Sequence, residues 1–441
     1  MNKDVSSFLD SITKEIKYSK VHKSISEEIA SHIEELKDDF MSEGFSEDES
    51  YKKAVECMGN PSDIGKDLHK THKPRVEWSI FMLIAILVGI GLYGLLMYSL
   101  YYYENVIYKQ IIWVALGITI LFVGYFINYK KIEKYSLHLY IGIMLMMTVA
   151  IILGDTVNGA RNYIIFLGIS ARISSIGMPF LIISYAGIVK KYCTGSLKTL
   201  VIILLMGIPS LALNLVLLDT SRVFILFVAY SIIILTVIFS ENYKKSKRAS
   251  LLILGLEWLC SISLGALFIV TNPYRLQRFT IFLNPYADPE GSGYLFVKLK
   301  ELWNSTKFIG DSGSLVSRKN GEILNQMPNL ETDFIFTFIS SSMGWIVGVI
   351  IITMLVAVII RLFLSSRKLN DLYGKTVCMA ICVVFALEVI INILMNLGYS
   401  PITGCGLPFI SYGGSDIVSN ALLMGVFLGI YRRKDILICE Q

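Results

Sequence analysis

Long apolar runs constrain this chain more than any other feature. From Trp78 onward, apolar stretches of about 20 residues recur, and each is long enough to cross the ~30 Å of hydrocarbon in a bilayer. The 441 residues are 54% hydrophobic and only 17% charged, which is less charge than a soluble domain carries. The sequence therefore predicts an all-α polytopic membrane protein with about ten transmembrane helices. The predicted spans are 78–100, 111–128, 137–153, 174–189, 199–217, 222–240, 250–271, 334–362, 376–397 and 414–431.

Lysine and arginine in the short loops indicate how the chain is oriented. Basic loops alternate with loops that are poor in these residues, and ten spans place every basic loop on the same side as both termini. Since positively charged loops stay on the cytoplasmic side, we expect both termini in the cytoplasm and the longest loop, 272–333, outside the cell. The basic loops are 128–135, 190–198, 241–248, 361–375 and 431–434.

Residues 1–75 precede the first apolar run and are predicted to form a small cytoplasmic helical module. Ser46 and Glu49 have the spacing of a capping box, and Asn60 followed by Pro61 opens a further helix. The module carries more acidic than basic residues. It is therefore either a bundle with a solvated acidic face or a docking or regulatory domain. The membrane domain would then be 76–434, followed by a cytoplasmic tail at 435–441.

Four unusual polar stretches fall on the predicted outer side of the membrane: 154–163, 272–294, 327–336 and 396–416. Three arginines in the first two stretches, Arg161, Arg275 and Arg278, go against the cytoplasmic bias of positive charge. Guanidinium groups at the level of the lipid headgroups suit phosphate or pyrophosphate. The alternative is that these side chains only reach toward the membrane surface or pair with Asp288 or Glu290.

Asp333 lies where the longest loop re-enters the membrane, directly before the apolar sequence FIFTFI. A carboxylate at this boundary loses part of its hydration, which raises its pKa and suits it to act as a general base. Aspartate is also a good N-cap residue, and a helix is expected to begin here. The two roles are compatible.

Two further carboxylates, Glu257 and Glu388, lie inside predicted spans. Charged groups inside a membrane are costly and are functional candidates by default. The alternative is that both are protonated and hydrogen-bonded to neighbouring helices. Asn392, one turn after Glu388, is then the expected partner.

The segment LPFISYGGSD at 407–416 combines a proline and two adjacent glycines at the outer end of the last span. Pro408, Gly413 and Gly414 interrupt helical geometry, and irregular backbone at membrane depth has to be buried in protein or line a wet cavity. The freed N–H groups, with Ser411 and Ser415, would hydrogen-bond an anionic or sugar-bearing ligand. The alternative is a re-entrant structural turn.

The seven cysteines show no paired spacing of metal ligands, and only Cys405 is placed outside the cell. We therefore expect no disulfide framework, and no metal site built from protein ligands alone is visible. No feature of the sequence points to nucleic acid as a partner.

In combination, these segments resemble the SEDS family of cell-wall proteins, which includes FtsW, RodA and SpoVE. LPFISYGGSD is similar to the family signature near the last membrane helix, LETDFIF (330–336) to its HTDFIF element and NGARNY (158–163) to its NGARRW element. YRLQRFTIFLNPYADPEGSGY (274–294) resembles the segment that opens the family's large outer loop. The resemblance extends over about 78–434.

The resemblance implies a peptidoglycan glycosyltransferase that polymerises lipid II on the outer face of the bacterial cytoplasmic membrane. It puts the family's essential aspartate at Asp333, which would deprotonate the acceptor hydroxyl, and it implies that Arg161, Arg275 or Arg278 would stabilise the leaving pyrophosphate. A divalent cation is a candidate cofactor, and a class B penicillin-binding protein is the expected partner. The other residues assigned to substrate binding are Thr332, Asn392, Pro408, Ser411, Gly413 and Gly414.

The chain departs from the family pattern at several polar positions. Glu331 stands where the family has histidine, and Asn162 and Tyr163 replace an arginine and a tryptophan. The family's QPSE element, with a lysine three residues later, corresponds to RISSIGM (172–178), so that its acid and its base become Ser175 and Met178.

These departures keep two other interpretations open. One is a non-enzymatic scaffold or regulator of cell-wall synthesis, and the other is a flippase for lipid-linked sugars that couples transport to protons at Glu257 or Glu388. Residues 1–75 resemble the small HAAS-like helical domains fused to some bacterial membrane proteins, which implies regulation or a cytoplasmic partner.

Overall fold

The computed structural model of the chain describes most of its length in two compact units. One unit contains residues 77–430, and the other contains residues up to 76 together with the chain from Tyr431 onward. The described residues are 3–73, 75–102, 106–157, 160–166, 169–193, 196–241, 243–313, 315, 318–319, 322–323 and 327–436.

The smaller unit is a helical bundle. The sequence signals at its helix starts are present: Ser46 and Glu49 form the capping box of α3, and the Asn60 side chain accepts a hydrogen bond from Ser62 N at the start of α4. Pro61 occupies the first helical position, where no N–H is needed. The elements are α1 (Lys3–Glu15), η1 (Ser19–Val21), α2 (His22–Ser42), α3 (Glu47–Met58) and α4 (Pro61–His72).

The core of this bundle includes a residue from the far end of the chain. Ile436 is buried in the same apolar cluster as Ile12 and Ile33. Nearby, Arg75 N donates to Arg432 O (3.3 Å) and the Arg75 guanidinium pairs with Asp435 (2.9 Å). Residues from Tyr431 to Ile436 therefore pack with the smaller unit, whereas the sequence assigns residues up to 434 to the membrane domain.

The larger unit is a membrane bundle. Within the described part of the chain, ten helices are long and apolar enough to cross a membrane, which confirms the predicted all-α polytopic fold. The helices are α5 (Trp78–Tyr102), α6 (Val106–Phe126), α8 (Ser136–Leu153), α9 (Ile173–Tyr192), α10 (Leu197–Val216), α11 (Thr220–Ile238), α12 (Lys247–Val270), α16 (Trp345–Arg367), α17 (Leu372–Asn396) and α18 (Gly414–Arg432).

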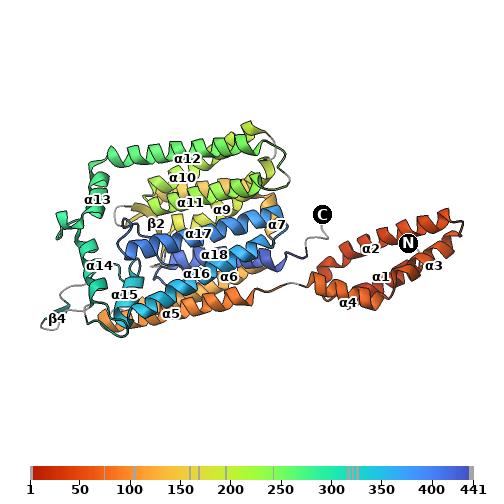
Figure 1. Ribbon diagram of the computed structural model, residues 1–441, viewed down its shortest axis with the longest axis horizontal. Helices are drawn as coiled ribbons and strands as arrows, with labels where there is room; N and C mark the ends of the chain where they lie inside the picture. Colours follow the sequence, from red (N-terminus) through yellow and green to blue (C-terminus); the bar gives the residue numbers. More distant parts are fainter. Residues whose placement is uncertain are drawn as a thin grey trace. The chain divides into compact units, whose positions relative to one another are not determined.

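Burial explains which spans carry polar residues. The two least apolar spans, α9 and α18, are also the two most buried ones. Helix faces that pack against protein tolerate polar side chains, whereas faces toward lipid do not. At the other extreme, α12 has only Ser250 and Leu254 buried and lies at the edge of the bundle in Figure 1.

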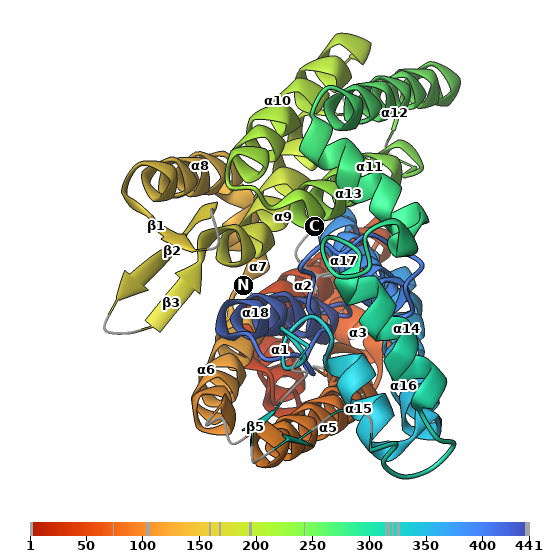
Figure 2. The same ribbon diagram turned by 90° about the vertical axis from the view of Figure 1, so that its left-hand side faces the viewer.

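Short elements gather at one end of the bundle, and the helix α7 (Tyr129–Lys134) lies at the opposite end (Figure 1). An antiparallel sheet packs against α8, and α13 to α15 lie on the other side of α9 and α18 (Figure 2). These elements are β1 (Asp155–Val157), β2 (Ala160–Phe166), β3 (Ile169–Arg172), α13 (Pro273–Leu283), η2 (Pro285–Ala287), α14 (Tyr294–Ser305), β4 (Arg318–Lys319), β5 (Glu322–Ile323) and α15 (Ile335–Met343).

The predicted span 334–362 is wrong at its start. The apolar run is divided by Gly344, which has a φ of +101° and separates the short helix α15 from the spanning helix α16. A Cβ atom at this position would lie 2.6 Å from Phe308 O. Gly344 therefore allows both the left-handed backbone and the close approach of the loop that contains Phe308.

Candidate functional site

The backbone of Asp333 is fixed from α17. Asn392 Nδ2 (3.0 Å) and Asn396 Nδ2 (2.9 Å) both donate to Asp333 O. Asn396 Oδ1 in turn accepts hydrogen bonds from Thr337 N and Oγ1 in α15. Two side chains of α17 therefore hold the carbonyl of Asp333, which fixes the main chain that carries its half-buried carboxylate.

The electrostatic surroundings of Asp333 favour its protonated form at mildly acidic pH. Burial, the largest cause, raises the pKa of Asp333 to about 6. The guanidinium of Arg172 lowers this pKa, and the carboxylates of Asp416 and Glu331 raise it. The alternative role as a helix cap is absent, since the N-cap of α15 is Phe334.

The segment 404–414 forms a wall beside this carboxylate. A Cβ atom at Gly404 would lie 3.9 Å from Asp333 Oδ2, and Tyr412 N donates to Glu331 O (2.9 Å). The backbone turns within this segment, because Ser411 N donates to Leu407 O (3.0 Å) and Leu407 N donates to Ser411 Oγ (2.6 Å). Ser411 is thus engaged within its own turn.

The remaining residues of this segment that the sequence assigns to substrate binding differ in exposure. Pro408 is buried, whereas Gly413 and Gly414 are half-buried. Gly414 packs so closely on Trp113 of α6 that an added Cβ atom would lie 2.0 Å from the indole ring. Thr332, next to Asp333, is half-buried, and its Oγ1 donates to Asn329 O (3.3 Å).

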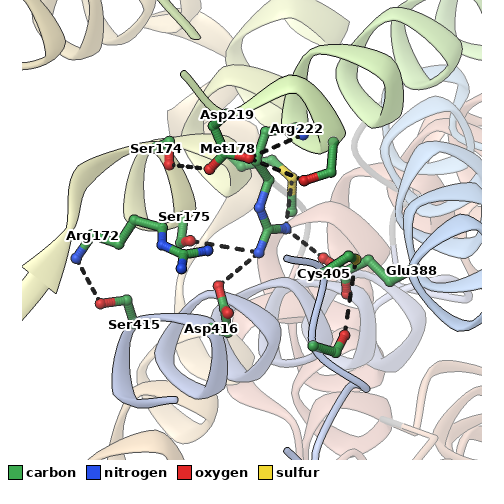
Figure 3. A network of polar contacts seen from close by, with 12 residues as sticks. Arg172, Ser174, Ser175, Met178, Asp219, Arg222, Glu388, Cys405, Ser415 and Asp416 are labelled. Atoms are coloured by element: carbon green, nitrogen blue, oxygen red, sulfur yellow. Dashed lines mark hydrogen bonds and ion pairs between the residues drawn. The ribbon is translucent and has the colours of Figure 1, made fainter. Parts of the chain in front are cut away.

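A polar network inside the bundle lies next to this wall (Figure 3). Its centre is Arg222 in the first turn of α11, whose guanidinium pairs with Glu388 of α17 and with Asp416 of α18, the latter at 2.6 Å. Asp219, the N-cap of α11, accepts hydrogen bonds from Arg222 N (3.3 Å) and from Ser174 Oγ of α9 (2.6 Å). Four helices therefore meet at one set of charges.

Arg172 connects the network to the sheet. The backbone N–H of Arg172 donates to Ser415 Oγ of α18 (2.8 Å). Its guanidinium donates to the Tyr163 hydroxyl through Nε (3.1 Å) and Nη2 (3.0 Å). Burial lowers the pKa of Arg172, but the carboxylates of Asp416 and Asp219 outweigh this and raise it. Arg172 is thus a permanent cation in the electrostatic neighbourhood of Asp333.

The three arginines that the sequence assigns to pyrophosphate binding, Arg161, Arg275 and Arg278, lie outside the network of Arg222 and differ in their surroundings. Arg275 stacks on the ring of Phe268 at the end of α12, 3.5 Å from the ring centroid, and donates to Phe268 O (3.3 Å). Arg161 on β2 and Arg278 on α13 are exposed. Arg275 is therefore packed against an aromatic ring in the way expected of a cation–π pair.

The two intramembrane carboxylates also differ. Glu388 pairs with Arg222 and belongs to its network. The amide of Asn392, the expected partner of Glu388, donates to the backbone carbonyls of Asp333 and Cys405. Glu257 is half-buried on α12, where its Oε2 has no hydrogen-bond partner among the described residues.

The described residues contain no group of three or more His, Cys, Asp or Glu side chains arranged to hold a metal ion. The carboxylate of Asp416, in the electrostatic neighbourhood of Asp333, is paired with Arg222. These residues do not fit a divalent cation held by protein ligands alone, and no chemical step is assigned to one.

Sequence reasoning missed Arg172, Arg222, Asp219 and Asp416. The signal for Arg222 was present, since this arginine opens the predicted span 222–240 and an intramembrane charge needs a partner. Asp416 is likewise the only charged residue in the segment 407–416. Two acids and one base inside apolar spans are a pattern of complementary charge that predicts contact between them.

Taken together, the fold and the site define a multi-pass membrane protein with a half-buried carboxylate at one end of its bundle, in the electrostatic neighbourhood of Arg172. The chain belongs to the FtsW/RodA/SpoVE family of cell cycle proteins, which matches residues 74–436.

Relatives support this assignment. A Coxiella burnetii protein named "Probable peptidoglycan glycosyltransferase FtsW" is 31% identical over 336 residues, which cover 73% of this chain and 85% of the relative. Stage V sporulation protein E of Bacillus subtilis is 33% identical over 166 residues, covering 37% of this chain and 44% of the relative.

Solved structures show the same fold. A chain of the structure described as "Structural coordination of polymerization and crosslinking by a peptidoglycan synthase complex" has a TM-score of 0.65 at 21% identity, with 81% of this chain and 98% of that chain covered. The rod shape determining protein RodA of Thermus thermophilus has a TM-score of 0.59 at 17% identity, and the match covers 81% of this chain and 97% of that chain.

Proposed function

We propose that this chain is a peptidoglycan glycosyltransferase that polymerises lipid II at the outer face of the bacterial cytoplasmic membrane. The observation that carries the proposal is Asp333: its carboxylate is half-buried, its pKa is raised to about 6, and its backbone is held by two asparagines. A carboxylate with this pKa is largely ionised at neutral pH and is a stronger base than an exposed aspartate.

The reaction requires the transfer of one proton and the departure of one leaving group. Asp333 accepts the proton of the acceptor sugar hydroxyl as the oxygen forms a bond to the anomeric carbon of the donor. The bond from that carbon to the pyrophosphate oxygen breaks, and undecaprenyl pyrophosphate leaves with the electron pair. Arg172 is in the electrostatic neighbourhood of Asp333, so its charge is available to stabilise the departing anion.

The other residues that the sequence assigns to the substrate remain part of this proposal. Arg161, Arg275 and Arg278 would attract the lipid-linked pyrophosphate to the outer surface. The wall beside Asp333 would be formed or supported by Thr332, Asn392, Pro408, Ser411, Gly413 and Gly414.

Orientation and partners complete the proposal. Both termini lie in the cytoplasm, because every basic loop is on their side of the membrane. A class B penicillin-binding protein is the partner that would cross-link the product; the likeness to a chain of a peptidoglycan synthase complex supports this. The smaller unit, which resembles HAAS-like domains, would bind a cytoplasmic regulator.

The test is lipid II polymerisation by the purified protein, alone and with a class B penicillin-binding protein. Asp333→Asn should lower the rate by roughly 10²- to 10⁴-fold, the contribution typical of a general base. Glu290→Gln, which changes an exposed acid of the same outer loop, should keep the wild-type rate. Equal rates in the wild type and Asp333→Asn would refute the catalytic role, and no glycan strands under any partner condition would favour a scaffold or regulator.

A further inference from the structure

Arg222 is the most deeply enclosed cation of the network. Its side chain is 5% exposed, and that of its partner Glu388 is 2% exposed. An arginine in the membrane part of a bundle is costly unless it is paired. An apolar residue at this position would avoid the free-energy cost of burying a charge, so the arginine is expected to have a specific role.

The contacts of the guanidinium show where its charge lies. Nη1 approaches Met178 Sδ (3.4 Å) and Nη2 approaches Ser175 Oγ (3.5 Å), both on α9. Positions three residues apart lie on one face of a helix, so the cation of α11 covers one face of α9 (Figure 3). Ser175 and Met178 carry no charge, so the positive charge at this face of α9 comes from α11.

The pairing of Arg222 also reaches the wall beside Asp333. Asp416 Oδ2 would lie 3.6 Å from a Cβ atom at Gly413 and 4.0 Å from one at Gly406. Between Gly404 and Gly406, Cys405 O accepts a hydrogen bond from Asn392 (2.7 Å), the same side chain that holds Asp333 O. The carboxylate of Asp416 therefore lies beside the part of the wall whose Cys405 carbonyl shares the Asn392 side chain with Asp333 O.

We infer that Arg222 is a positioning residue for Asp333, and that this role requires a positive charge in the space between α11 and Met178 of α9. The cation fixes α17 and the first turn of α18 against α9, and it neutralises the acid nearest to the wall. The predicted effect on the reaction rate rests on the proposed function. The prediction that a positive charge can be moved from α11 to α9 without loss of stability does not.

The test exchanges the position of one charge. Arg222→Met should lower kcat by roughly 10- to 100-fold, as expected when a catalytic group is slightly misplaced. In Arg222→Met/Met178→Lys the lysine stands where the guanidinium was, and it should restore much of the rate and of the Tm. Met178→Lys alone should instead lower both, because two cations would then be adjacent. The same substitution is thus harmful in one background and beneficial in the other.

Two further measurements separate positioning from simple stabilisation. Ile176→Lys, which introduces the same charge at a half-exposed position of α9, should not rescue Arg222→Met. The acidic limb of the pH–rate profile of Arg222→Met should move to higher pH, because the carboxylate of Asp416 raises the pKa of Asp333 and is no longer neutralised. A change in Tm with an unchanged limb and unchanged kcat would overturn the positioning role.

The outcomes distinguish this inference from the proposed function. If the wild type makes glycan strands and Asp333→Asn does not, but Met178→Lys lowers the Tm equally in both backgrounds, the inference is wrong and the function stands. If no strands form under any condition while the lysine still reverses its effect on the Tm, the proposed function is wrong and the exchange of charge stands.

Discussion

A single carboxylate, Asp333, is placed where it costs stability. In the folded protein its pKa is raised to about 6, compared with about 3.9 for an aspartate in an unfolded chain. The folded state therefore holds the proton more tightly, and its stability falls as the pH rises from about 4 through about 6. Catalytic groups are often held in such unfavourable surroundings.

Asp333→Asn should therefore lower the reaction rate strongly without lowering stability. Above pH 7 the asparagine variant is expected to unfold at a Tm higher by roughly 6–12 °C, the shift for about 3 kcal/mol in a large domain, since it avoids the buried charge. Near pH 4.5 this difference should shrink. Thermal unfolding in detergent at both pH values measures it, and a lower Tm of the variant at pH 8 would contradict the account.

The cation beside Asp333 is expected to set the pH dependence of the reaction. Arg172 lowers the pKa of Asp333, so Arg172→Gln should raise that pKa and move the acidic limb of kcat/KM to higher pH. Arg161→Gln removes an exposed arginine of the same sheet and serves as the control. A limb that stays in place in Arg172→Gln, or that moves equally in Arg161→Gln, would show that Arg172 does not face the carboxylate.

The sequence identifies Asp333 but not its surroundings, and the reason is physical. Asp333 stands at an abrupt change from polar to apolar sequence, which is a local signal. Arg172 comes into its electrostatic neighbourhood only through the pairing of β2 with β3 and the packing of α9 and α18. Contacts between residues so far apart along the chain follow from tertiary packing and leave no local pattern.

At the scale of helices, apolar length predicts the spans well and their breaks poorly. Ten runs of the sequence correspond to ten helices, within the described part of the chain, that are long and apolar enough to span a membrane, because a lipid-facing helix needs an unbroken apolar surface. Gly344 divides one run without any change in hydropathy, since the left-handed turn is required by the loop that packs on it. The sheet of β1 to β3 is likewise not predicted, because the polar stretch 154–163 indicates a loop between two spans and carries no sign of strand pairing.

The contact between α6 and α18 should depend on a single missing side chain. Gly414→Ala places a methyl group 2.0 Å from the ring of Trp113, and overpacking of this kind costs about 1–3 kcal/mol. We expect a lower Tm and reduced polymerisation, both partly restored by Trp113→Leu in the same protein. Gly142→Ala, on a face of α8 with no atom within 4 Å of the added Cβ, should leave the Tm unchanged. A similar loss in both glycine variants would indicate a general effect of alanine.

At the scale of the whole molecule, the chain closes its smaller unit with its own C-terminal end. Ile436 lies in the core formed by α1 to α4 and is separated from it in sequence by the entire membrane bundle. The sequence predicts the bundle from its helix signals, but a lone isoleucine near the end of a chain carries no signal of where it packs.

The two units can be followed separately, because all five tryptophans lie in the membrane unit. Ile436→Ala should destabilise the smaller unit by about 2–5 kcal/mol, as for other buried isoleucines, and limited proteolysis should then cut residues 3–72 faster. Unfolding followed by tryptophan fluorescence should be unchanged, and Ile436→Val should give a smaller increase in cleavage. Unaltered cleavage in Ile436→Ala would remove Ile436 from the core, and a matching shift in the fluorescence transition would mean that the two units unfold together.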